Sequence, residues 1–236
     1  TVLFTDVRNF TTISENMETK ELTHFINSFL TPLTRVLHHN RGTIDKYMGD
    51  AIMAFWGAPL NDPNHARNAL LTGMEMIKET KKLQQSFKKK GWPEIKIGVG
   101  INTGPMNVGN KGSEFRVDYT VLGDAVNLGS RLEALTKVYG VEIITSESTI
   151  HAVPEFEYRQ LDQVRVKGKD KPIKKYEPLG LIETIDKKIR KTIKTYHHAI
   201  DLYRQQKWDE AEKILFTLKQ QEPERLIYQI YLERIA

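Results

Sequence analysis

Two short hydrophobic runs, each bordered by an aspartate, constrain the fold of this chain more than any other feature. Residues 2–5 (Val-Leu-Phe-Thr) precede Asp6, and Asp50 precedes residues 51–55 (Ala-Ile-Met-Ala-Phe), directly after Gly49. Runs of this length and composition are typical of buried β-strands. A carboxylate at the end of such a strand is held by the sheet and still reaches its rim. We therefore expect a sheet whose edge carries two acidic side chains.

If Asp6 and Asp50 lie close together, their charges repel each other unless a proton or a cation intervenes. Carboxylate oxygens are hard ligands that suit Mg²⁺ or Mn²⁺, and phosphate oxygens often complete the coordination shell. The pair thus predicts a metal–nucleotide site. Taken one at a time, the two aspartates would be ordinary turn or capping residues.

Length and charge are compatible with such a site. The chain has 236 residues, enough for one medium domain with a core and a small appendage. Its net charge of +5 comes from 35 basic and 30 acidic residues. The lysine runs at 88–90 and 187–188 have no interleaved aromatic residues, so we interpret them as solvated faces and expect no nucleic-acid partner. The absence of cysteine excludes disulfides, thiolate metal sites and cysteine nucleophiles.

The pattern of hydrophobic residues predicts a mixed α+β fold. We expect a strand at 1–6, a helix across 22–37, a hairpin of strands at 43–47 and 50–56, a helix from Asp62 to Gly91, and a strand at 95–101. This order resembles the split βαβ arrangement of ferredoxin-like folds. A strand at 115–121, a helix from Gly123 and strands at 141–144, 156–166 and 172–179 would extend that βαββαβ core.

The chain changes character after about Gly180. Residues 189–203 have helical spacing of apolar side chains, Asp209 with Glu212 forms a plausible capping box, and Pro223 marks a break. We predict a small all-helical, tetratricopeptide-like extension at 183–236 that follows a main domain at 1–182. One such helical unit cannot bury its own apolar face, so it should pack on the main domain or on a second copy.

Four motifs, at residues 4–11, 45–50, 118–133 and 166–169, resemble those of the class III nucleotidyl cyclase catalytic domain. They are most similar to its bacterial adenylate cyclase branch. The resemblance covers roughly residues 1–180, and the order of the four motifs makes a chance match improbable. The helical tail resembles, more loosely, the extension that follows such domains in bacterial cyclases fused to membrane receptors.

The resemblance implies that Asp6 and Asp50 bind two divalent cations, Mg²⁺ or Mn²⁺, with the Val7 carbonyl as a further ligand. One cation would lower the pKa of the ribose 3′-hydroxyl, and the other would hold the triphosphate and the departing pyrophosphate. It also implies that Asn9, Phe10 and Thr11 cradle phosphate oxygens at a helix N-terminus.

Many family members have glycine where Asn9 stands. Asn tolerates a left-handed backbone better than most residues, so we expect the loop to keep its shape. The alternative is an ordinary helix N-terminus capped by Thr11 or Thr12, and it is compatible with phosphate binding.

Lys46 and Thr120 match the family's base-selecting pair. An ammonium can donate to adenine N1 and a hydroxyl can accept from the N6 amine, whereas guanine-selective cyclases usually carry Glu and Cys at these positions. The pair implies ATP as substrate. An ion pair between Lys46 and Asp45 is the alternative for Lys46, although strand alternation should send Asp45 to the opposite face. Asp118 is another candidate adenine partner, two positions away from the family register.

Asn127 and Arg131 stand four residues apart, so one helical face presents both. The resemblance implies that Asn127 orients the ribose and that Arg131 stabilises charge on the α-phosphate. An ion pair of Arg131 with Glu133 or Asp124 is disfavoured by the spacing. Lys167 matches a lysine that contacts the terminal phosphates, with Lys169 as the alternative.

The family's site is split across a head-to-tail dimer, so the resemblance implies a homodimer with two sites, and the glycine-bearing stretch at 109–115 is a candidate contact arm.

The expected function is adenylate cyclase, which converts ATP to 3′,5′-cyclic AMP and pyrophosphate. A guanylate cyclase, an inactive cyclase-fold regulatory module and a polymerase-like or diguanylate-forming palm are the alternatives. We further expect a membrane-receptor region before residue 1, and hence the cytosolic part of a membrane-anchored protein.

Overall fold

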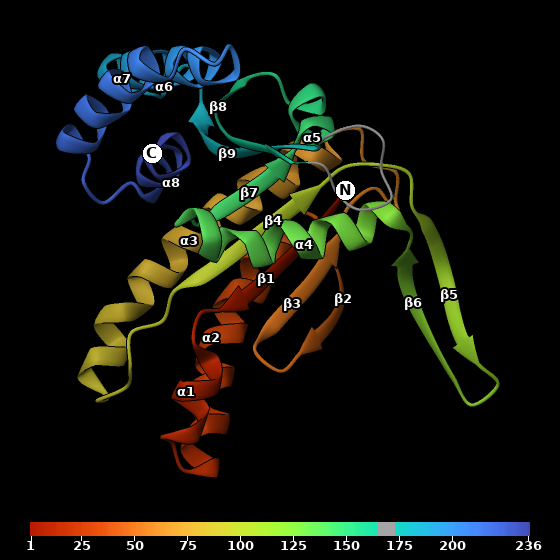
Figure 1. Ribbon diagram of the computed structural model, residues 1–236. Helices are drawn as coiled ribbons and strands as arrows, with labels where there is room; N and C mark the ends of the chain where they lie inside the picture. Colours follow the sequence, from red (N-terminus) through yellow and green to blue (C-terminus); the bar gives the residue numbers. More distant parts are fainter. Residues whose placement is uncertain (165–172) are drawn as a thin grey trace. The chain divides into compact units, whose positions relative to one another are not determined.

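The computed structural model describes residues 1–164 and 173–236 (Figure 1). These residues form two compact units. The first contains Thr1–Thr136 and Glu142–Val153, and the second contains Lys137–Val141 and Pro154–Ala236. Within the described residues, none of the helices combines the length and the apolarity that a membrane-spanning segment needs.

The first unit has the predicted ferredoxin-like core. Its strands are β1 (Val2–Val7), β2 (Thr43–Met48), β3 (Ala51–Phe55), β4 (Ile97–Asn102) and β7 (Ile143–Ser146), in the sheet order β2-β3-β1-β4-β7. Strand β1 pairs antiparallel with both β3 and β4, and β7 is parallel to β4. The long helices α2 (Thr19–His39) and α3 (His65–Lys89) connect β1 to β2 and β3 to β4. This βαββαβ order confirms the expected fold class.

Helix α4 (Asp124–Tyr139) lies very close to strand β4 because two glycines leave room for it. A Cβ atom at Gly100 would collide with the Glu133 backbone nitrogen, and one at Gly98 would meet the side chains of Glu133 and Thr136. Gly100 pairs with Phe4 of β1, and Gly98 pairs with Asp6. Directly paired residues share a face of the sheet, so Asp6 points to the face that α4 covers.

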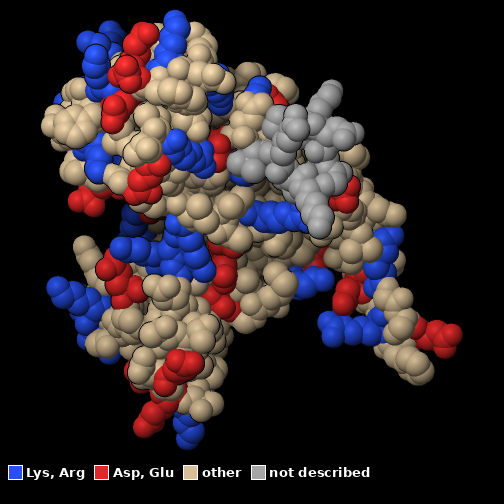
Figure 2. All heavy atoms as spheres, viewed as in Figure 1, with Lys and Arg blue, Asp and Glu red and all other residues tan. Residues whose placement is uncertain are grey.

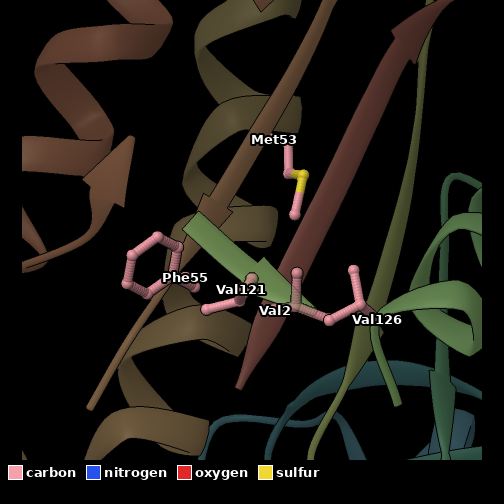
Figure 3. Close-up of a cluster of buried hydrophobic side chains, with 5 residues drawn as sticks. All are labelled: Val2, Met53, Phe55, Val121 and Val126. Atoms are coloured by element: carbon pink, nitrogen blue, oxygen red, sulfur yellow. The ribbon is translucent and has the colours of Figure 1, made fainter. Parts of the chain in front are cut away.

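A hydrophobic cluster joins four elements on this face (Figure 3). Its side chains point toward one another in the figure and come from β1, β3, β6 (Arg116–Leu122) and α4: Val2, Met53, Phe55, Val121 and Val126. Burial of five such side chains contributes roughly 1.5–3 kcal/mol each before entropic costs. The cluster fixes the base of β6 and the start of α4 against the strands that carry the two aspartates.

Strands β5 (Asn107–Ser113) and β6 form a separate two-stranded sheet. This β5–β6 arm extends away from the main sheet of the first unit in Figure 1. Phe115 at its tip is 96% exposed, and Val117 and Leu122 are also exposed. The strand expected at 115–121 corresponds to β6, but no strand was predicted in the glycine-bearing stretch at 109–115, where β5 ends. Residues 107–113 lack the alternation of apolar and polar side chains that marks a half-buried strand, so β5 gave no such signal.

Two short helices complete the first unit. Helix α1 (Phe10–Glu15) follows β1 directly, and α5 (Glu147–Ala152) follows β7. Helix α5 was not predicted, because six residues are too few to show helical periodicity. Ser146 caps it, since its side chain accepts a hydrogen bond from the Thr149 backbone N–H.

The second unit combines a β-hairpin with three helices. Strands β8 (Phe156–Val164) and β9 (Ile173–Leu181) are antiparallel, and α6 (Lys187–Arg204), α7 (Trp208–Gln221) and α8 (Leu226–Ile235) follow. The Tyr196 hydroxyl of α6 donates to the Gln160 carbonyl of β8 (2.8 Å), and the Tyr231 hydroxyl of α8 donates to that of Leu161 (3.0 Å). The helical extension thus packs on β8, a strand of the predicted main domain. The division at residue 182 stays a prediction.

Two details of the extension differ from expectation. The capping box of Asp209 and Glu212 does not form, because α7 begins at Trp208 and already includes both residues. Ile189 is exposed, while Ile193, Tyr196 and Ile200 of the same predicted stripe are buried. The buried stripe therefore begins one turn later than the sequence pattern indicated.

Asp162 of β8 joins three parts of the second unit. Its carboxylate accepts hydrogen bonds from the Tyr139 hydroxyl (2.6 Å), from both terminal nitrogens of Arg234 (3.2 and 2.9 Å) and from the Gln163 backbone (2.7 Å). Burial alone would raise the pKa of Asp162, but these hydrogen bonds and the Arg234 charge outweigh it and lower the pKa. The junction connects β8 with the end of α4 and with α8.

Basic and acidic side chains are interspersed on the face shown in Figure 2. Nucleic-acid binding surfaces instead gather Lys and Arg on one face or stripe. The expectation of no nucleic-acid partner stays a prediction.

Replacing Arg234 should destabilise the second unit measurably. Arg234→Met leaves the buried Asp162 carboxylate without its bidentate partner, so we expect unfolding free energy to fall by about 2 kcal/mol in urea denaturation. Arg204→Met is the matched control, because Arg204 pairs with exposed Asp201 at 3.6 Å. That variant should cost less than about 1 kcal/mol. Equal effects of the two substitutions would contradict the role given to Asp162.

Candidate active site

Asp6 and Asp50 meet at the end of strands β1 and β3. Thr5 pairs with Ile52, so Asp6 ends up beside the turn that carries Asp50. Gly49 has a φ of 67°, which a glycine adopts without strain at the tight turn between β2 and β3. The Asp50 carboxyl accepts a hydrogen bond from the Val7 backbone N–H (3.0 Å) and shares a second hydrogen bond with the Asp6 side chain. The expected proximity of the two carboxyl groups is confirmed.

Their contact changes the protonation of Asp50. Partial burial, the hydrogen bond with Asp6 and the negative charge of Asp6, in that order, raise the pKa of Asp50 to about 7. The Val7 N–H acts in the opposite direction. Without a cation, one proton therefore holds the two carboxyl groups together near neutral pH.

This arrangement fits a divalent cation, which could replace the shared proton and neutralise both carboxylates. Among residues 1–164 and 173–236, no cluster of three or more His, Asp or Glu side chains could hold a metal ion. Further ligands would have to be backbone, water or substrate oxygens, as is usual where Mg²⁺ binds a nucleotide. The contact of the Val7 N–H with Asp50 was not predicted, and a ligand role for the Val7 carbonyl stays a prediction.

The loop after Asp6 has the expected backbone. Asn9 is left-handed, with φ 58° and ψ 29°, and α1 begins at the next residue, Phe10. Asn9 itself occupies the N-cap position without a side-chain hydrogen bond, so the alternative caps Thr11 and Thr12 are wrong. Phosphate binding by Asn9, Phe10 and Thr11 stays a prediction.

Lys46 and Thr120 both contact Asp45. The Thr120 hydroxyl donates to one carboxylate oxygen of Asp45 (2.5 Å), and the Lys46 ammonium lies 3.0 Å from the other. The expectation that strand alternation sends Asp45 to the opposite face is wrong. The pairing register shifts between Ile44 and Lys46, so Asp45 occupies a β-bulge. A bulge redirects the local side chains, which no single-sequence alternation pattern reveals.

Asn127 and Arg131 share the exposed face of α4. Gly129 and Glu133, which lie between and beyond them, instead pack toward the sheet. A two-residue offset on a helix is close to half a turn, which explains the separation. Asn127 and Arg131 therefore point away from the sheet that carries Asp6. Lys167 and its alternative Lys169 lie outside the described residues.

A ferredoxin-like core with adjacent carboxyl groups at the end of β1 and in the turn before β3, and an outward-facing Asn-Arg pair on α4, is the arrangement expected of a nucleotidyl cyclase domain. The family model of the adenylate and guanylate cyclase catalytic domain matches residues 1–179. The chain belongs to this family. Families of this kind generally use divalent metal ions, in agreement with the carboxylate pair.

Three relatives illustrate the similarity. An adenylate cyclase of Anabaena cylindrica is 40% identical over 182 residues, which are 75% of this chain and 36% of that protein. The chain thus spans about a third of the length of this relative. The crystal structure of the adenylyl cyclase CyaB from P. aeruginosa has a TM-score of 0.70 and 34% identity, covering 78% of this chain and 95% of that one. The guanylyl cyclase Cya2 has the same TM-score, 32% identity, and coverage of 78% and 93%.

Asp50→Asn should make the metal-free protein more stable. The amide can still accept from the Val7 N–H, but it removes a half-buried charge from beside Asp6. At pH 8 and with a chelator, we expect the midpoint of thermal unfolding to rise by about 2–4 °C, equivalent to roughly 1 kcal/mol. Mn²⁺ should raise the midpoint of the native protein and leave that of Asp50→Asn nearly unchanged. Equal Mn²⁺ shifts in both proteins would argue against this metal site.

Proposed function

We propose that this domain converts ATP to 3′,5′-cyclic AMP and pyrophosphate. The observation that carries the proposal is the contact between the Asp6 and Asp50 carboxyl groups at the strand ends. A single acidic residue at a turn is common, but two held together at a sheet edge repel each other unless a proton or a cation balances them, and a divalent cation can balance both charges. The fold, the family and the position of the pair all agree with this chemistry.

Asp6 and Asp50 would hold two divalent cations, Mg²⁺ or Mn²⁺. Bound there, these ions would neutralise the triphosphate and lower the pKa of the ribose 3′-hydroxyl. The role of the protein is to hold the two carboxyl groups in alignment, and the bound cations would keep both of them ionised. Pairing of β1 with β3 and the Val7 N–H provide that alignment. The left-handed Asn9 precedes α1, three residues after Asp6, and the first-turn N–H groups of this helix could contact phosphate oxygens.

Lys46 and Thr120 support adenine as the base. Both side chains gather around Asp45, so one donor and one acceptor lie side by side at the base of the β5–β6 arm. Structural similarity alone cannot select the base, because an adenylyl and a guanylyl cyclase match this chain equally well. The donor and acceptor types at Lys46 and Thr120 favour ATP over GTP.

A head-to-tail homodimer would complete each site. In one chain, Asp6 lies on the sheet face beneath α4, while Asn127 and Arg131 lie on the outer face of that helix. A second copy could bring its Asn127 to the ribose and its Arg131 to the α-phosphate. The β5–β6 arm, with Phe115 fully exposed and Val117 and Leu122 also exposed, supplies apolar surface for such a contact. A lone chain would then have two incomplete half-sites.

A product assay decides between the candidate functions. The protein should convert ATP with Mn²⁺ or Mg²⁺ to cyclic AMP, and its kcat/KM for ATP should exceed that for GTP by at least about tenfold. Mass spectrometry of the products identifies the alternatives. Cyclic GMP formed from GTP at a rate comparable to that of cyclic AMP from ATP would indicate a guanylate cyclase. A dinucleotide would indicate a palm-type enzyme. No product from a folded dimer would indicate an inactive module.

Mixing two inactive variants tests the shared site. Asp50→Asn and Arg131→Ala should each lose at least about 10²-fold in turnover while keeping their fold, because each lacks a group that stabilises charge in the transition state. Random exchange makes half of the dimers heterodimers, and each heterodimer has one intact site, so the mixture should recover about a quarter of native activity. A control mixture of Asp50→Asn with Asp6→Asn should stay inactive. Failure of the first mixture to recover would count against the shared site.

A further inference from the structure

Asp45 is a buried carboxylate with an unusual set of partners. Its side chain is 0% exposed, in the bulge of β2. It accepts hydrogen bonds from the Thr120 hydroxyl (2.5 Å) and the Val121 backbone N–H (3.3 Å), and the Lys46 ammonium lies 3.0 Å away. Burying a charge is unfavourable unless donors compensate it. Here the two side-chain donors are the two residues proposed to select the base.

The contact with Asp45 fixes what Thr120 can do. A hydroxyl has one proton and two lone pairs. Thr120 is 6% exposed, and its proton is used in the hydrogen bond to Asp45. Toward a bound base, Thr120 can therefore only accept. Adenine presents the N6 amine as a donor, whereas guanine presents O6, an acceptor. A lone pair of Thr120 would attract the first group and repel the second.

Asp45 also restrains the Lys46 ammonium. Lys46 is 44% exposed in its side chain, and a free lysine at such a site samples many rotamers. The ion pair with a fully buried carboxylate holds the ammonium beside Asp45, the residue that Thr120 also contacts. Its protons can be donated to adenine N1. One carboxylate thus sets both the acceptor and the donor of the pair.

We propose that Asp45 is the specificity-determining positioning residue of this site: it fixes the hydroxyl proton of Thr120 and the ammonium of Lys46, and so makes the pocket complementary to adenine. This inference rests on the proposed function. It adds a residue that would not touch the substrate but would decide how Lys46 and Thr120 contact it.

The test measures the contribution of the N6 amine in two proteins. Asp45→Asn has the same shape as the native residue, but its amide can donate to Thr120 and release the hydroxyl proton to rotate outward. The substrates are ATP, GTP and purine riboside triphosphate, which is ATP without the N6 amine. In the native protein, loss of the amine should lower kcat/KM about tenfold. In Asp45→Asn this penalty should shrink several-fold, and the ratio of kcat/KM for GTP over ATP should rise about tenfold.

Glu79→Gln is the matched control. Glu79 and Lys82 of α3 form an ion pair of the same 3.0 Å length, and neither residue belongs to the strands that carry the base-selecting pair. This variant should keep the native amine penalty and the native GTP-to-ATP ratio. If Asp45→Asn fails to fold, Asp45→Ser replaces it, because a serine also removes the fixed acceptor while occupying less space.

The outcomes separate this inference from the proposed function. If Asp45→Asn lowers kcat/KM for ATP and for purine riboside triphosphate by the same factor, Asp45 is only structural and the inference is overturned. If the native protein makes no cyclic product at all, the proposed function fails instead. In that case, equilibrium dissociation constants of ATP and purine riboside triphosphate test the role of Asp45. The loss of affinity on removal of the N6 amine must then be smaller in Asp45→Asn than in the native protein.

Discussion

Repulsion between two neighbouring carboxyl groups is the constraint on which the rest of this molecule depends. Asp6 and Asp50 are brought together by the pairing of β1 with β3, and partial burial raises the pKa of Asp50 to about 7. A sheet edge would avoid such a pair if stability were the only requirement. The hydrophobic cluster around Phe55, which joins β1, β3, β6 and α4, helps to hold the strands that bring the two groups together.

Strand pairing brings Asp6 and Asp50 together, whereas the close packing of α4 on the sheet keeps Asn127 and Arg131 away from them. Gly98 and Gly100 allow the helix to approach so closely that Glu133 fills the space beside them. Asn127 and Arg131 lie on the outer face of the helix, away from the sheet face that carries Asp6. Under the proposed function, the two groups of site residues are therefore divided, and a second copy would supply the other half.

Much of the fold could be predicted because local patterns dominate it. The strands at Asp6 and Asp50, the long helices and the order of the βαββαβ core all follow from hydrophobic periodicity. Strand β5 could not be predicted in this way, since its sequence is rich in Gly and Asn and its ladder is formed with β6 in a two-stranded sheet. The failed capping box at Asp209 has a similar cause, because the neighbouring helices rather than the local motif set where α7 begins.

The sequence by itself determined the fold class and identified the side chains that we propose to bind cations, phosphate and a base, because residue type and spacing carry that information. Only the tertiary structure decided which of these groups meet. The bulge at Asp45 reversed the expected direction of a side chain and joined it to Lys46 and Thr120, two residues separated by more than seventy positions in the chain. Such contacts depend on strand register and on packing between distant segments, and neither is encoded in a local pattern.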